Sequence, residues 1–254
     1  MTPAAPLLRM ADVRVAYGDL EVLRDLSLEV HHGEFVALVG PSGCGKTTLL
    51  NLASGWLAPS AGSVSRPERV RMVFQQDGLF PWRTVLENVR LGLRHVADAA
   101  LAAQRADELL DLVGMTGFAE HYPHQLSGGM RQRVELARAL AGDTDLLLMD
   151  EPFSALDYLT RLRMRAELAR LLRERPRTVV LVTHDIEEAA QLADRVLVLS
   201  GRPSRVRDEV RLTAPRPRAA TDPAGVGAVH RVLTEMGLEH EPETAPVAGG
   251  VEVP

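Results

Sequence analysis

The sequence predicts an α/β fold with a mostly parallel central sheet, and two observations carry that prediction. Four short apolar runs lie at residues 34–39, 146–149, 178–183 and 195–199. Each run is bounded by polar or glycine residues, a pattern typical of strands buried on both faces of a parallel sheet. The balance of 46% apolar and 25% charged residues over 254 residues is that of an ordinary globular chain with one or two domains.

Two further segments predict additions to this core. Residues 8–17 alternate apolar with polar side chains, residues 22–30 show a similar pattern, and Gly18-Asp19 is a turn signal. We therefore expect an antiparallel β subdomain at the N-terminus. From residue 86 to residue 140, apolar residues recur at helical spacing. This predicts an inserted α-helical subdomain at about 83–141.

The segment after Ser200 changes character. Its prolines and arginines predict a linker, followed by a short helix over 223–236 that begins after Asp222 and stops at Gly237. The acidic residues 239–254, which include Gly and Pro, are predicted to be disordered. We expect a main domain at 1–213 and a C-terminal extension at 214–254. The apolar face of the predicted helix consists of Val226, Val229, Leu233 and Met236.

Charge and cysteine content exclude several classes of protein. The chain has 34 acidic and 29 basic residues, and the basic ones are scattered, which argues against a nucleic-acid-binding protein. Cys44 is the one cysteine, so the chain forms no internal disulfide and no cysteine zinc cluster. Apolar runs are too short to span a membrane and the N-terminus lacks a signal-peptide pattern. We expect neither a secreted nor an integral membrane protein.

A glycine-rich loop follows the first predicted core strand and opens a helix. In such a loop, backbone N–H groups and the helix N-terminus bind phosphates, Lys46 reaches the terminal phosphates, and Thr47 ligates Mg²⁺. Lys46 is the single lysine among the basic residues. The alternative, a glycine-rich turn with a stray lysine, does not account for the strand–loop–helix context. The residues assigned to phosphate binding are Gly40, Pro41, Ser42, Gly43, Cys44, Gly45, Lys46, Thr47 and Thr48.

Two acidic residues end the second core strand. In parallel α/β sheets, ligands bind beyond the carboxyl ends of the strands, where both this pair and the glycine-rich loop are expected to lie. Asp150 is placed to hold Mg²⁺, and Glu151 to orient or deprotonate an attacking water. By itself a strand that ends in two acids is commonly a solvated strand end. The neighbouring phosphate loop favours the functional interpretation.

A second helix start also has the composition of an anion site. Ser127, Gly128 and Gly129 precede an amphipathic helix over 131–141 and expose its N-terminus. An ordinary capped helix start is the competing interpretation of these residues.

Together these motifs resemble the ATP-binding subunits of ABC transporters, and the resemblance covers residues 7–213. It implies a P-loop NTPase fold with a RecA-like core, ATP and Mg²⁺ as ligands, and ATP hydrolysis. Met130 departs from the family pattern, in which Gln is commoner, and residues 60–69 are shorter than the usual hairpin. The roles implied by the resemblance are adenine stacking by Tyr17, catalysis by Gln75, Glu151 and His184, Mg²⁺ ligation by Thr47, Gln75 and Asp150, a signature motif at Ser127, Gly128, Gly129 and Gln132, and a D-loop at Asp157.

Several of these residues have a plainer interpretation. Tyr17 continues an apolar face and could pack in the core, and His184 could be a satisfied histidine at a strand end. Gln75 is chosen over its neighbour Gln76 on the family register. Cys44 is interpreted as a small loop residue, although a thiol at a helix N-terminus is expected to be reactive and to be protected from alkylation by MgATP.

The resemblance also implies partners. Two such subunits form a head-to-tail homodimer, in which the signature motif of one completes the site of the other, and the dimer drives two integral membrane permease subunits served by a solute-binding protein. Residues 77–89 are similar to the nitrate, sulfonate and taurine import branch, and Leu79, Phe80, Pro81 and Trp82 are expected to dock the permease. This places the chain at the cytoplasmic face of the membrane as a peripheral protein, with no nucleic-acid partner.

Two rival functions remain at this stage. A soluble ATPase switch of the same fold usually carries two cassettes or a long coiled-coil insert, which this chain lacks. A nucleotide-binding module without catalysis is disfavoured by Glu151 and His184.

Overall fold

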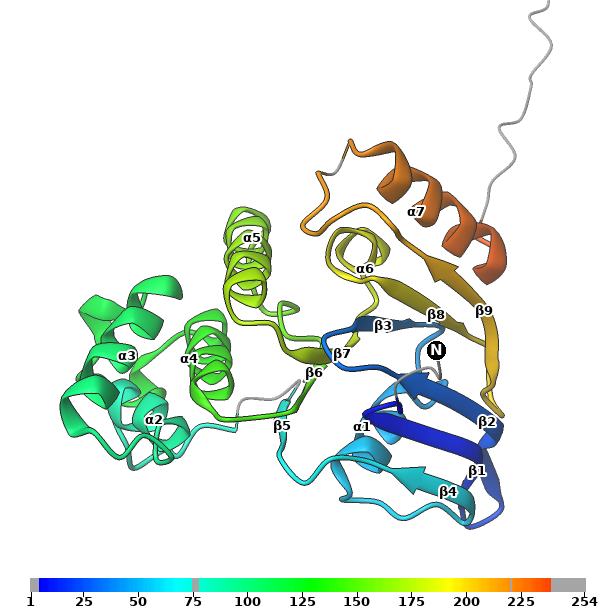
Figure 1. Ribbon diagram of the computed structural model, residues 1–254, viewed down its shortest axis with the longest axis horizontal. Coiled ribbons are helices and arrows are strands. Elements are labelled where there is room, and N and C mark those ends of the chain that lie inside the picture. The colour runs from blue at the N-terminus through cyan, green and yellow to red at the C-terminus, as the bar shows by residue number, and fades with distance from the viewer. Residues whose placement is uncertain (1–4, 75–77, 220, 239–254) are drawn as a thin grey trace, which may run out of the picture.

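The computed structural model describes residues 5–74, 78–219 and 221–238, and a six-stranded sheet forms its centre (Figure 1). The strand order is β5-β6-β7-β3-β8-β9. All neighbours from β5 to β8 are parallel, and β9 runs antiparallel to β8. The α/β class and the four predicted core strands are thus confirmed. The strands are β3 (Phe35–Val39), β5 (Val70–Val73), β6 (Leu146–Asp150), β7 (Thr178–Val182), β8 (Arg195–Leu199) and β9 (Val206–Arg211).

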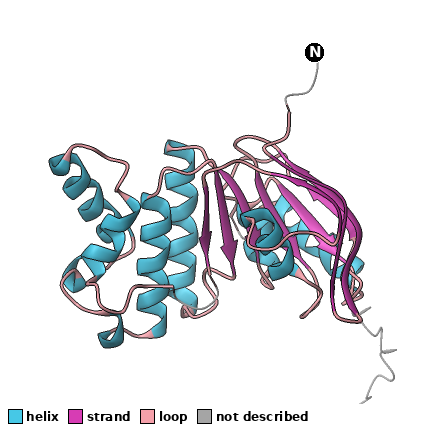
Figure 2. Cartoon of the chain, turned by 90° about the horizontal axis from the view of Figure 1, so that it is seen from below, coloured by secondary structure: helices cyan, strands magenta, loops and turns pink. Residues whose placement is uncertain are grey.

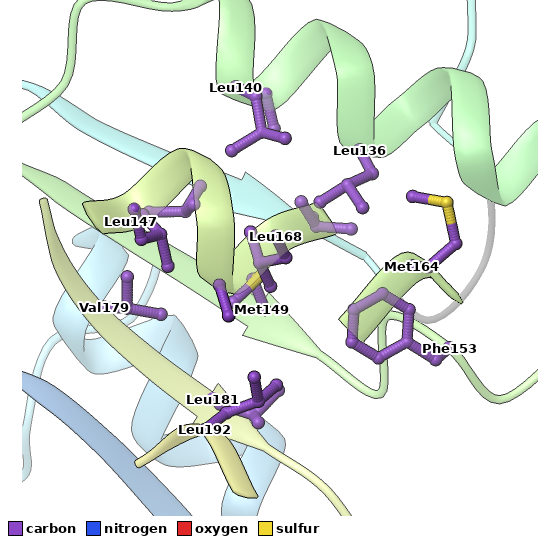
Figure 3. Close-up of a cluster of buried hydrophobic side chains, with 14 of the residues drawn as sticks. Leu136, Leu140, Leu147, Met149, Phe153, Met164, Leu168, Val179, Leu181 and Leu192 are labelled. Carbon is purple, nitrogen blue, oxygen red and sulfur yellow. The ribbon is translucent and has the colours of Figure 1, made fainter. Parts of the chain in front are cut away.

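Both faces of this sheet are covered, which explains why its strands are unbroken apolar runs. In β3, Val36 and Leu38 face α1 (Lys46–Ser54) and a second sheet, whereas Phe35, Ala37 and Val39 face the opposite helical layer. Helices α5 (Tyr158–Glu174) and α6 (Ile186–Leu192) belong to that layer. Figure 3 shows side chains of α4 (Gly128–Ala141), α5, β6 and β7 meeting in this core. Each fully buried Val, Leu or Phe contributes roughly 1.5–3 kcal/mol relative to an exposed position.

The second sheet has three antiparallel strands in the order β2-β1-β4. Leu8 pairs with Val30 and Met10 with Leu28, which confirms the predicted N-terminal antiparallel subdomain. The strands are β1 (Leu8–Tyr17), β2 (Leu20–Val30) and β4 (Ala61–Ser65). Strand β4 was not predicted, because its sequence Ala-Gly-Ser-Val-Ser carries little apolar alternation and its strand conformation depends on pairing with β1.

The helical subdomain lies between β5 and β6 in the chain, as predicted. It consists of α2 (Val85–Gly92), α3 (Ala99–Leu112) and α4 (Gly128–Ala141). Thr84 and Glu87 form a reciprocal capping box at the start of α2, and Ser127 caps α4. Figure 2 shows this group of helices at one end of the molecule, beside the sheets. The start of α4 therefore belongs to a different lobe from the start of α1.

The predicted linker is wrong over residues 206–211, which form β9 at the edge of the sheet. The predicted helix is confirmed as α7 (Pro223–Met236), with Asp222 and Gly237 as its caps. Its buried residues are Gly225, Ala228 and Val232, while Val226 is 53% exposed. The predicted apolar face is therefore wrong at Val226, because the face of α7 that packs on α6 and β9 carries Ala228 and Val232 instead. Residues 239–254, predicted to be disordered, lie outside the described residues.

Among the residues that the structure describes, none of the helices is both long enough and apolar enough to cross a membrane.

Candidate active site

The carboxyl ends of four adjacent strands meet at one edge of the central sheet. At this edge β6 ends in Asp150-Glu151, and β7 is followed by His184. Strand β3 leads into the loop 40–47, and β8 leads into the loop 200–205. A cavity of about 620 Å³ opens at this edge. Its lining includes Tyr17, Lys46, Thr47, Asp150, Glu151 and His184. Tertiary structure thus brings together residues that are far apart in the sequence, at the position where parallel α/β sheets bind ligands.

The loop 40–47 has the shape of a phosphate cradle. Gly45 has φ 112°, a backbone conformation that residues with a side chain rarely adopt. A Cβ there would also lie 2.8 Å from Val22 Cγ1, which leaves no room for a side chain. Lys46 is buried, and its Nζ donates hydrogen bonds to the carbonyl oxygens of Gly40 at 2.8 Å and Pro41 at 3.1 Å. No side chain caps the N-terminus of α1, whose N–H groups and dipole favour an anion.

Two side-chain oxygens of the kind that bind divalent cations lie at the end of this loop and beside it. Thr47 Oγ1 donates a hydrogen bond to Asp150 Oδ2 at 2.8 Å. Burial raises the pKa of the Asp150 carboxyl, although the hydrogen bond from Thr47 opposes that rise. A hydroxyl and a carboxylate beside a phosphate site suit Mg²⁺, which takes few protein ligands and completes its shell with phosphate and water oxygens.

Glu151 is held in an unusual backbone conformation that aims its carboxylate into the cavity. Its φ is 48°, a value rare for a residue other than glycine. The Glu151 N–H donates to Val182 O at 2.9 Å, and its carbonyl accepts from Ser154 Oγ at 3.0 Å and from Gln132 Nε2 at 3.1 Å. His184 Nδ1 lies 3.3 Å from Glu151 Oε2. These contacts bring a carboxylate and a mostly exposed imidazole side by side at the mouth of the cavity.

Gln132 corrects one assignment made from the sequence. Its side chain is buried, and besides donating to Glu151 it accepts a hydrogen bond from Ala155 N at 3.1 Å. Both ends of the amide therefore bond within the same chain, and little of the side chain is exposed. Gln132 instead ties α4 to Glu151 and to Ala155.

The structure gives the positions of several other predicted residues. Tyr17 is 52% exposed at the end of β1 and lines the cavity, so packing in the core is excluded. Ser127 and Gly128 are exposed at the start of α4 and do not line the cavity of their own chain. Asp157 caps α5 by accepting from Thr160 N. The Thr160 side chain and then its backbone N–H lower the Asp157 pKa. Gln75 lies outside the described residues.

Burial overturns two expectations. Cys44 is 1% exposed and packs in the core between the two sheets and α1, so its thiol cannot react at the rate expected for an accessible helix N-terminus. Leu79 is likewise buried, in the core of the helical subdomain. Its side chain therefore cannot contact a partner, and the predicted docking surface reduces to Phe80, Pro81 and Trp82.

Sequence reasoning missed a buried charge cluster behind His184. The Arg165 guanidinium on α5 pairs with Asp185 and lies 3.6 Å from Glu188 Oε2, which accepts from Thr183 Oγ1 at 2.7 Å. Burial raises the pKa of Glu188 to about 7, and Arg165 offsets only part of that rise. Burial also opposes ionisation of Asp185, yet the Glu188 N–H and Arg165 hold the Asp185 pKa below its usual range. A run of basic residues on α5 gave no signal that one of them is buried.

Known proteins resemble this chain in sequence and in fold. A family model described as ABC transporter matches residues 23–154. An aliphatic sulfonates import ATP-binding protein of Paracoccus denitrificans is 46% identical over 95% of this chain and 97% of its own. A taurine import ATP-binding protein of a Jannaschia species is 46% identical over 77% and 76%. A solved dimeric ATP-binding cassette with bound ADP and Pi superimposes with a TM-score of 0.72 at 34% identity, over 82% of this chain and 99% of that one.

Family match, relatives, fold and site geometry point the same way: the chain belongs to the ABC transporter family, as one of its ATP-binding subunits that hydrolyse ATP.

Proposed function

We propose that this chain is the ATP-hydrolysing subunit of an importer for a small oxyanion such as a sulfonate, taurine or nitrate. The observation that carries the catalytic part is the pairing of Glu151 with His184 at 3.3 Å, next to Thr47 and Asp150. A module that only binds nucleotide has no need of a strained backbone that aims a carboxylate into the cavity. The solute class follows from similarity to sulfonate and taurine import proteins.

The arrangement suits hydrolysis of a bound triphosphate. Tyr17 offers its ring to the adenine, and the loop 40–47 with Lys46 holds the phosphates. Thr47 and Asp150 would hold Mg²⁺, which neutralises phosphate charge. Glu151 orients a water and accepts its proton, while His184 supports the Glu151 carboxylate and faces the terminal phosphate.

The working unit proposed is a head-to-tail homodimer. Ser127 and Gly128 form an exposed helix start outside the cavity of their own chain, and α4 lies in the helical lobe away from α1 (Figure 1). A second copy that presents this helix start to the phosphate loop would complete the site. The similar cassette bound to ADP and Pi is dimeric, which supports this proposal.

The proposed docking surface for the permease consists of Phe80, Pro81 and Trp82. Trp82 is 69% exposed and its ring lies 5.4 Å from that of Phe80. Phe80 lines two adjoining cavities, one of which also contains Trp82, Arg71 and Arg94. Such an aromatic lip beside a groove suits a short helix from a membrane protein. Two permease subunits held here would place the chain peripherally at the cytoplasmic face of the membrane, where a solute-binding protein is an indirect partner.

Trp82→Ala is expected to abolish solute uptake while leaving folding and MgATP binding nearly unchanged. An exposed side chain contributes little to folding, whereas buried Trp anchors often cost more than 2 kcal/mol at an interface, or about 30-fold in affinity. Uptake by cells and co-purification with the permease measure the effect. Val226→Ala, at an exposed apolar position on α7, is the matched control. Normal uptake by Trp82→Ala would contradict the docking surface.

The solute class is tested by growth. A strain that lacks this gene is expected to lose growth on a sulfonate or taurine as sulfur source, or on nitrate as nitrogen source, and the wild-type gene restores it. Glu151→Gln should not restore growth, because transport requires hydrolysis. Undiminished growth of the deletion strain on all three sources would refute the proposed solute class.

A further inference from the structure

The loop between β8 and β9 is anchored at both sides. Ser204 is fully buried; its N–H donates to Val22 O at 2.8 Å and its carbonyl accepts from Arg24 N at 3.2 Å. At the other side Ser200 N donates to Arg205 O at 3.0 Å, and Ser200 Oγ accepts from Arg205 N at 3.0 Å. Residues between these anchors are thus held in a fixed position next to β2 and the phosphate loop.

Arg202 projects from this loop onto the phosphate cradle. A Cβ placed on Gly43 would lie 3.2 Å from Arg202 Nη2, so the guanidinium covers the glycine at van der Waals distance. Arg202 also lines the same cavity as Lys46, Thr47 and Tyr17. The guanidinium therefore stands over the backbone that is shaped to hold phosphate.

Among the described residues, no carboxylate forms an ion pair with the Arg202 guanidinium. Its neighbours on the chain are paired differently: Arg205 lies 3.7 Å from Asp25, and Arg207 lies 3.3 Å from Glu235. Lys46 donates to two loop carbonyls. A nucleotide triphosphate brings several negative charges to this position, and planar guanidinium groups suit phosphate oxygens.

We propose that Arg202 is a nucleotide-binding residue that contacts the phosphate chain from the β8–β9 loop. The contact adds a second cation to Lys46, next to Gly43 in the same cavity. This inference deepens the proposed function, because it rests on nucleotide binding at this cavity. The alternative is an arginine that merely covers Gly43 and remains solvated when nucleotide binds.

Equilibrium binding of MgADP and of a non-hydrolysable MgATP analogue to the full chain tests the proposal. Arg202→Ala is expected to weaken binding by about tenfold, the size typical of one charge-assisted hydrogen bond at a partly exposed site. Arg205→Ala removes the same charge from the same loop and should stay within about twofold of the wild type. Arg202→Lys keeps the charge and should recover most of the affinity. Weaker binding of both nucleotides places the contact at a shared phosphate, whereas an effect on the triphosphate alone places it at the terminal one.

Two results would overturn the inference. One is that Arg202→Ala binds both nucleotides as tightly as the wild type does. The other is that the two variants lose affinity equally, which would indicate a general effect of charge rather than a contact. Failure of the wild-type chain to bind nucleotide would instead refute the site itself. Thermal unfolding without nucleotide should be alike for all variants, because Arg202 is exposed.

Discussion

Glu151→Gln is expected to reduce steady-state ATP hydrolysis by about 10²- to 10⁴-fold, the range typical for loss of a positioned general base. The amide keeps the shape of the carboxylate but loses the charge that accepts a proton from water. The backbone contacts that hold Glu151, from Val182, Ser154 and Gln132, involve main-chain atoms and survive the substitution. MgATP binding should therefore remain within a few-fold of the wild type. Phosphate release and equilibrium binding are the two measurements.

A control for this substitution lies close by. Glu187→Gln removes an exposed carboxylate from α6 and should leave turnover unchanged. Turnover of Glu151→Gln within threefold of the wild type would show that another group activates the water.

Arg165→Met is expected to lower the free energy of unfolding by about 3 to 5 kcal/mol, the cost typical of removing one partner from a buried ion pair. Arg165 is 4% exposed, and its loss leaves only Arg161, Thr183 and the Glu188 N–H as the contacts given for the Asp185 and Glu188 carboxylates. Methionine fills a similar volume, so a cavity contributes little. Urea unfolding without nucleotide measures the change.

Arg170→Met provides the matched control on the same helix. Arg170 is exposed and pairs with Glu167 and Glu174 at the surface, so its replacement should leave stability nearly unchanged. If Arg165→Met lowers the free energy of unfolding no more than Arg170→Met does, the buried cluster does not stabilise the fold. Reduced turnover of Arg165→Met at low denaturant would further indicate that the cluster positions His184 through Asp185.

The sequence alone determined the features that a short stretch of chain encodes. Unbroken apolar runs predicted β3, β6, β7 and β8, because a strand buried on both faces has no polar side to display. The phosphate loop is likewise local, since eight consecutive residues build its cradle. The start of α7 followed from Asp222 and its end from Gly237, which act through neighbouring backbone groups.

Only the tertiary structure decided how distant residues combine. Thr47 and Asp150 are 103 residues apart and meet because β3 and β6 end at the same edge of the sheet. Pattern reasoning placed Gln132 in the signature motif, whereas the fold turns its amide inward to hold Glu151, 19 residues on. Burial of Leu79, Cys44 and Arg165 likewise depends on which element packs over each residue, and side-chain type does not specify that. Arg202 lies in a segment rich in proline and arginine, and nothing in that pattern indicated a role for it. It lines the cavity because hydrogen bonds to β2 fix its loop beside the phosphate loop.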